Sequence, residues 1–188
     1  MSSAIQQLPE LVRLHERHDG LTDALAGTFA EAASVCLSRH HTPPKAVMVS
    51  ADTPEDASYL TDWPPPTVGI RRAWANAVDA TEAGAYGLTL AAAEAHLGLV
   101  ALSRSEQGTG ADYYIGRPGS GINPVDGELD LEEAFRLEIS GIDRCDAEYI
   151  LARRVREKVE QARAGVSSLP AFAGVVAFNM CRIVFQDV

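Results

Sequence analysis

Apolar and charged positions alternate with a helical period over the first forty residues. This spacing predicts a helix over Ala4–His18 that ends at Asp19–Gly20. A second helix is predicted over Leu21–His41, and Pro43–Pro44 ends it because a proline ring clashes with the preceding helical turn.

The next segment lacks a helical period. Lys45–Ser50 is an apolar run typical of a short strand, and Thr67–Arg71 is expected to form another. Between them, Asp52–Pro66 carries four prolines and predicts a partly extended loop. We therefore treat residues 1–70 as an N-terminal helical extension with a short strand and a Pro-rich loop, and place a soft boundary near Pro66.

Residues 71–188 predict one compact α/β unit. A long Ala- and Leu-rich helix is expected over Arg72–His96. Gly84 and Gly87 lower its helix propensity, so we expect them to allow another element to approach closely. The elements expected after it are strands at Leu99–Ser105, Ala111–Gly116 and Leu131–Gly141, a charged amphipathic helix at Cys145–Ala164, and strands at Pro170–Phe178 and Cys181–Phe185.

Composition narrows the class of protein. The 188 residues include 26 acidic and 16 basic side chains, for a net charge of −10. A chain this acidic is not expected to bind nucleic-acid phosphates non-specifically over its whole surface, so contact with nucleic acid needs a local basic patch or a partner. The three cysteines form no metal-ligand spacing and no disulfide framework. No secretion signal and no membrane-spanning apolar run is found, so we expect a cytoplasmic protein without a membrane partner.

Two acidic residues stand on strands that are expected to be neighbours. Side chains alternate between the faces of a strand, and this alternation places Glu138 on a polar face opposite Leu137 and Ile139. If the strand with Asp112 lies beside it, the two carboxylates converge and offer the oxygen ligands that Mg²⁺ prefers. Glu82, on a polar stripe of the preceding helix, is a candidate third ligand. The alternative without a metal site is that the acids form ion pairs with two arginines, Arg104 and Arg136.

The order helix–strand–strand–strand–helix–strand resembles the restriction-endonuclease-like core of the PD-(D/E)xK nuclease superfamily. The resemblance covers roughly Ala75 to Phe185 and is carried by Gly110-Ala111-Asp112-Tyr113 and Leu137-Glu138-Ile139-Ser140. It implies a mixed sheet flanked by helices, with Mg²⁺ or Mn²⁺ held by Asp112 and Glu138. Glu82 resembles the acidic residue that many members carry on the first core helix.

The chain departs from the family pattern at Ser140, where the motif has a lysine that helps to activate the attacking water. Some members recruit the basic group from the following helix instead. Here that helix carries Lys158, with Gln161 and Arg154 on the same face. We predict Lys158 as the relocated basic group and Gln161 beside it. The alternative for Lys158 is a solvated lysine that pairs with nearby glutamates.

Three functions follow as hypotheses. The first, implied by the resemblance, is metal-dependent hydrolysis of DNA by an endonuclease-like enzyme, in bacterial DNA processing or defence against foreign DNA. A second copy of the chain or a partner protein would supply recognition. The second is a catalytically inactive nuclease-fold subunit that serves as a structural or interaction module. The third is an unrelated α/β assembly protein whose acids pair with Arg104 and Arg136.

Overall fold

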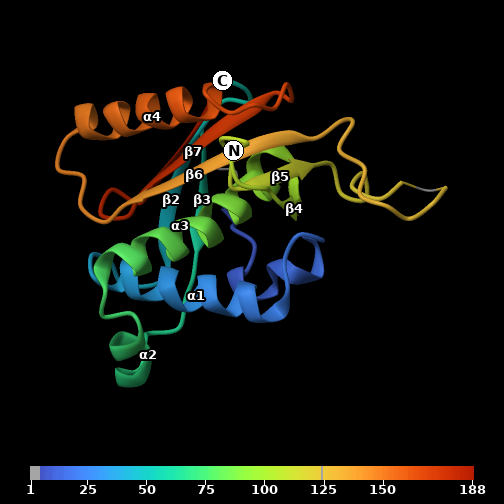
Figure 1. The fold of residues 1–188 in the computed structure, drawn as a ribbon. Helices are drawn as coiled ribbons and strands as arrows, with labels where there is room; N and C mark the ends of the chain where they lie inside the picture. The colour runs from blue at the N-terminus through green and yellow to red at the C-terminus, as the bar shows by residue number, and fades with distance from the viewer. Residues whose placement is uncertain (1–4, 124) are drawn as a thin grey trace.

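An eight-stranded mixed sheet runs through the molecule in the computed structural model, which describes residues 5–123 and 125–188 (Figure 1). The strand order is β1-β3-β2-β8-β7-β6-β5-β4. The pairs β1–β3, β2–β8 and β6–β7 are parallel, and the other pairs are antiparallel. The strands are β1 Gln6–Gln7, β2 Lys45–Ser50, β3 Ala57–Thr61, β4 Val100–Arg104, β5 Tyr113–Gly116, β6 Phe135–Ile142, β7 Ala171–Ala177 and β8 Arg182–Asp187.

Helices cover both faces of this sheet. Helix α3 (Ala77–Ala92) lies on one face and α4 (Glu148–Arg163) on the other, while α1 (Asp23–Ser38) packs on the outer side of α3 (Figure 1). The shorter helical elements are a 3₁₀ segment at Leu11–Glu16, α2 at Val68–Ala73 and a π-helical turn at Ala93–Leu97. The layers therefore run α4, sheet, α3, α1, an α/β arrangement with a mixed sheet flanked by helices.

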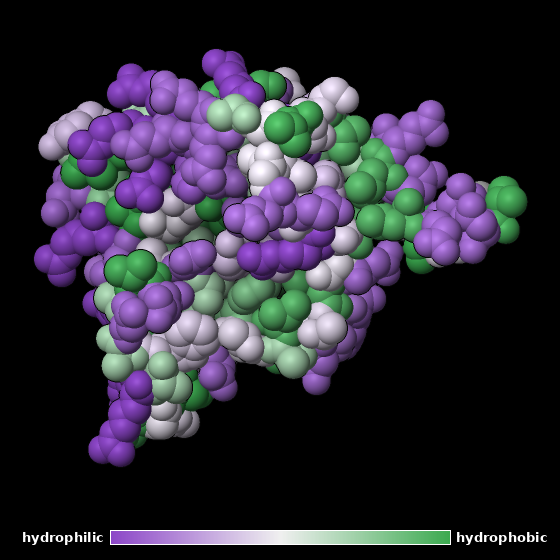
Figure 2. All heavy atoms as spheres, in the orientation of Figure 1, coloured by the Kyte–Doolittle hydropathy of each residue, from purple (hydrophilic) through white to green (hydrophobic). Residues whose placement is uncertain are grey.

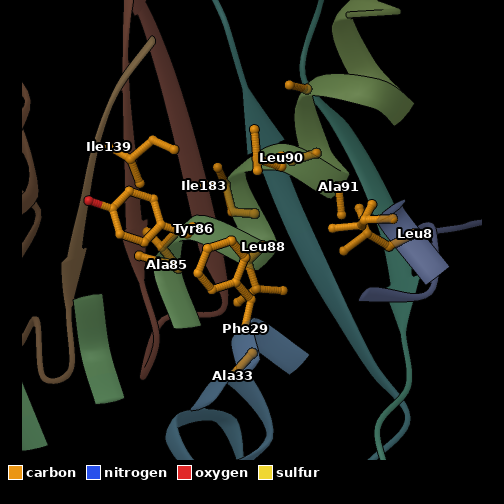
Figure 3. Packing of buried hydrophobic residues seen from close by; sticks show 14 of the residues in the cluster. Leu8, Phe29, Ala33, Ala85, Tyr86, Leu88, Leu90, Ala91, Ile139 and Ile183 are labelled. Carbon is orange, nitrogen blue, oxygen red and sulfur yellow. The ribbon is translucent and has the colours of Figure 1, made fainter. Parts of the chain in front are cut away.

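The contact between α1 and α3 depends on small residues. A Cβ atom added at Gly84 would lie 3.0 Å from the backbone of Ala33, and one at Gly87 would lie 3.0 Å from the Cβ of Phe29. The prediction that these two glycines admit another element is confirmed. In Figure 3, Phe29 and Ala33 of α1 lie beside α3, whose Tyr86 directs its hydroxyl away from the apolar cluster.

Helix α4 is amphipathic, as its sequence pattern predicts. Leu151, Val155 and Val159 are buried against the alanine and valine side chains of β7. Their spacing of four residues keeps them on one stripe of the helix. Hydrophilic side chains cover the outer surface of α4 (Figure 2). The helix is thus fixed on the sheet through its apolar stripe, which determines which of its polar residues meet β6.

Two predictions for the N-terminal segment are wrong. Ala4–His18 is not one helix: Gln6–Gln7 pairs with β3, and Pro9 separates this strand from the 3₁₀ segment. The predicted loop Asp52–Pro66 contains β3, which pairs with both β1 and β2. Residues 5–70 therefore supply the strands β1, β2 and β3 to the same sheet as the remainder of the described chain.

The predicted strand Thr67–Arg71 is also wrong, because these residues open a helix. The Thr67 side chain accepts a hydrogen bond from the Ile70 backbone N–H at 3.2 Å and caps α2. The long helix expected over Arg72–His96 is divided in two, since Asn76 caps a new start at Ala77. From α3 onward the observed order of helices and strands is the predicted one.

The connection between β5 and β6 projects from the body of the molecule (Figure 1). Three large apolar side chains on it, Ile122, Val125 and Leu129, are exposed, and hydrophobic surface is visible there in Figure 2. Among the described residues, no helix is long and apolar enough to cross a membrane.

Candidate functional site

The polar face of β6 matches one stripe of α4 residue by residue. Alternate positions on β6 lie about 7 Å apart, and positions four apart on a helix rise about 6 Å. Arg136 Nη1 donates to the Ala162 carbonyl, Lys158 Nζ donates to Glu138, and Arg154 Nη1 donates to Ser140. Because these two spacings nearly coincide, a strand residue every second position meets a helix residue every fourth position.

Glu138 is the buried centre of this interface. Its side chain is 4% exposed, and its Oε1 accepts a hydrogen bond from Lys158 Nζ at 2.8 Å. Lys158 Nζ also donates to Gln161 Oε1 at 3.0 Å. Burial raises the pKa of Glu138, the nearby charge of Asp112 acts in the same direction, and the Lys158 ammonium opposes both. The structure therefore brings Glu138, Lys158 and Gln161 together, as predicted.

Asp112 lies immediately before β5, which begins at Tyr113, two residues after the predicted start at Ala111, so Asp112 is not within the strand that was predicted to carry it. Its backbone N–H donates to the Leu137 carbonyl at 2.8 Å, and its Oδ2 accepts from the Ile139 N–H at 2.7 Å. The Asp112 carboxylate thus accepts the hydrogen bond of a β6 backbone N–H, Ile139, that has no partner in the β5–β6 ladder. Asp112 therefore bonds to the backbone N–H of the residue that follows Glu138, and both side chains line the same two cavities.

Tyr86 of α3 holds Asp112, and Arg104 of β4 packs on Tyr86. The Tyr86 hydroxyl donates to Asp112 Oδ1 at 2.7 Å. Burial raises the pKa of Tyr86, and Asp112 adds to this, so the hydroxyl keeps its proton at neutral pH. The Arg104 guanidinium lies over the rings of Tyr86 and Tyr113, at 4.7 and 4.9 Å from their centroids. The sequence pattern did not single out Tyr86 as a site residue.

All five predicted site residues line one pocket of about 600 Å³: Glu82, Asp112, Glu138, Lys158 and Gln161. Glu82 is exposed at its edge on α3. A second cavity of about 520 Å³ adjoins it and is lined by Arg104, Gln107 and the loop before β5. Asp112, Glu138 and Gln161 border both cavities, so open space lies on each side of the acid pair.

The two arginines proposed as partners of the acids have other partners. Arg136 is 5% exposed and donates to the carbonyls of Thr109, Ala162 and Leu169 at 2.8, 2.8 and 3.0 Å. Arg104 donates to the hydroxyls of Tyr113 and Tyr86. In the described part of the chain neither forms an ion pair with Asp112 or Glu138, so that alternative is wrong.

The acid pair fits a small hard cation. Each carboxylate oxygen offers two lone pairs, and each bonded oxygen of Asp112 and Glu138 has one described donor. Mg²⁺ commonly takes one or two carboxylates and fills its shell with water and phosphate oxygens. Residues 5–123 and 125–188 contain no group of three or more His, Cys, Asp or Glu arranged around one metal position. Glu82 shares the pocket, and its role as a ligand remains a prediction.

Comparison with models of known families, with curated proteins and with solved structures finds no match for this chain. The geometry of the site itself is therefore the basis for a functional proposal.

Proposed function

We propose that this chain is a Mg²⁺- or Mn²⁺-dependent phosphodiesterase that cleaves DNA internally, in a restriction-endonuclease-like fold. The carrying observation is the contact of Lys158 Nζ with Glu138 at 2.8 Å and with Gln161 at 3.0 Å. At the motif position that the resemblance fills with lysine, this chain has Ser140. The ammonium of Lys158, delivered from α4, supplies the missing positive charge to the same acid.

Each residue has a role that its contacts support. Asp112 and Glu138 would hold the metal, which when bound polarises a phosphoryl oxygen and lowers the pKa of a water. A lysine ammonium has three N–H donors, and Glu138 and Gln161 take two. The third is left to position the attacking water. Gln161 fixes the direction of the ammonium, and Glu82 would orient a water at the edge of the pocket.

DNA as the substrate is supported by the shape of the groove and by the individual cations that line it. Because cavities lie on both sides of the acid pair, a chain can continue past the site in both directions. Such an arrangement favours cleavage inside a polymer over removal of an end. Three basic side chains, Arg144, Arg154 and Lys158, line the larger cavity beside four acidic ones, Glu82, Asp112, Glu138 and Asp143, so individual cations and the bound metal would meet the phosphates. Recognition would come from a second copy of the chain or a partner protein, in bacterial DNA processing or defence.

A second candidate is a catalytically inactive subunit of the same fold. Ser140 at the lysine position and the strong negative charge favour it. An inactive subunit would use the groove or the projecting β5–β6 connection as a contact surface. It would not require the acid pair to bind metal.

Incubation with plasmid DNA separates these functions. The wild type, Asp112→Asn and Glu138→Gln are compared in Mg²⁺, in Mn²⁺ and in EDTA. Glu160→Gln, which removes an exposed carboxylate from α4, is the matched control. The enzyme hypothesis predicts metal-dependent cleavage by the wild type and the control and none by the two site variants. No cleavage by any form, together with no Mn²⁺ binding by calorimetry, would favour the inactive subunit.

A further inference from the structure

Arg154 occupies a particular place one helical turn from Lys158. Its Nη1 donates to Ser140 Oγ at 3.2 Å, so a guanidinium lies over the short side chain at the motif position. Its Nε lies 3.2 Å from Glu157 Oε2. The side chain is 41% exposed and lines the same pocket as the acid pair. Two anchors on one side therefore hold the guanidinium against the wall of the groove.

The guanidinium keeps free capacity for a ligand. It has five N–H donors in a planar fork, and Nη2 donates to no residue that the structure describes. Arginine forks match the geometry of phosphate oxygens and are often bidentate. The neighbouring cation Lys158 is engaged by Glu138, and the pocket's Asp143 is engaged by Arg39. Arg154 is thus an anchored cation in the pocket with donors still available.

We infer that Arg154 is a substrate-positioning residue that binds a non-bridging phosphate oxygen of the nucleic acid about one helical turn from the acid pair. This inference rests on the proposed function and names how the groove holds its substrate. Ser140 orients the Arg154 guanidinium by accepting its hydrogen bond, and this is the role of the serine at the motif position. Lysine at position 140 would occupy the space that the guanidinium fills.

The adjacent arginine provides a matched control. Arg153 also pairs with Glu157, at 3.6 Å, but its side chain is 62% exposed and it does not line the pocket. Arg153→Gln and Arg154→Gln therefore remove the same charge from the same helix, and each removes one of the two arginines that pair with Glu157. Only Arg154→Gln removes a donor from the groove.

The experiment measures binding of a short fluorescent DNA duplex by anisotropy in EDTA over a series of salt concentrations. Arg154→Gln should bind about tenfold more weakly, since a hydrogen bond to a charged group is lost. The slope of log K against log salt should fall by about 0.9, the value for one phosphate contact on duplex DNA. Arg153→Gln should change neither, and Arg154→Lys should keep the slope while losing part of the affinity.

Equal behaviour of Arg153→Gln and Arg154→Gln would overturn the inference, and so would absence of salt-dependent binding by the wild type. Matching thermal melting curves for the two variants exclude a folding defect as the cause of a difference. Cleavage is scored separately: binding that depends on Arg154 without cleavage by any form rejects the enzyme but keeps the phosphate site. Cleavage that is indifferent to Arg154→Gln in both KM and kcat keeps the enzyme and rejects this residue.

Discussion

Replacing Lys158 with methionine tests whether its ammonium stabilises the charged form of Glu138. The pair is largely buried, with side chains 19% and 4% exposed, and the two atoms are 2.8 Å apart. Removal of one partner of a buried pair costs about 3–5 kcal/mol. Because the lysine end is partly solvated and methionine preserves much of the packing, we expect a loss of about 2–3 kcal/mol in the free energy of unfolding near neutral pH.

The loss in Lys158→Met should depend on pH in a defined direction. Burial and Asp112 already raise the pKa of Glu138, and without the opposing ammonium the folded-state pKa rises further. A carboxyl group with a raised pKa costs stability above that pKa, where it must ionise in the folded protein. Below its unfolded-state pKa it is protonated in both states and the cost disappears. The difference from wild type is therefore greatest at high pH and shrinks as pH falls.

Urea unfolding at about pH 8 and about pH 5.5 measures this difference, with Glu138→Gln and the double variant completing a cycle. In the double variant the buried charge is absent, so removal of Lys158 should cost less than about 1 kcal/mol. An equal loss at both pH values, or an equal loss with and without the Glu138 carboxylate, would refute the argument.

Three other changes have expected results. Arg136→Met should lower the free energy of unfolding by about 3 kcal/mol, because two buried carbonyls and one part-buried carbonyl lose their donor, whereas Arg163→Met, at an exposed position on α4, should cost little; urea unfolding measures both. Gly84→Ala should cost about 1–3 kcal/mol by forcing α1 from α3, while Gly69→Ala in α2, with its nearest neighbour at 3.7 Å, should be neutral or stabilising in the same assay. Mn²⁺ affinity measured by calorimetry should fall on acidification while the pH is still above the ordinary glutamate range, because the raised pKa of Glu138 protonates a ligand early; a decline confined to the ordinary range would contradict this.

The order of elements from α3 to β8 could be predicted because each has a clear hydrophobic period and is bounded by turns. In residues 5–70, helix α1 and strand β2 were predicted, but the other elements were not. Gln6–Gln7 and Ala57–Thr61 are strands through pairing with distant partners, and no local pattern encodes a β1–β3 pair. Thr67–Ala73 depends on capping, since Thr67, the first residue of the predicted strand Thr67–Arg71, is the N-cap of α2.

The residues of the candidate site were predictable where periodicity places them on one face. Glu138 and Lys158 follow from the alternation of a strand and the turn of a helix, given that the two elements pack. Tyr86, Arg104 and the link from Ser140 to Arg154 were not predicted, because they depend on how α3 and α4 are set on the sheet. The role of Ser140 at the lysine position of the motif can therefore be interpreted only when the packing of α4 on β6 is known.

Plasmid cleavage by the wild type and by Asp112→Asn is the measurement that tests the central claim most directly. The account predicts that supercoiled DNA is converted to nicked or linear forms in Mg²⁺ or Mn²⁺, that EDTA abolishes this, and that Asp112→Asn abolishes it while the fold is retained. Asp112→Asn that cleaves at the wild-type rate would contradict the account.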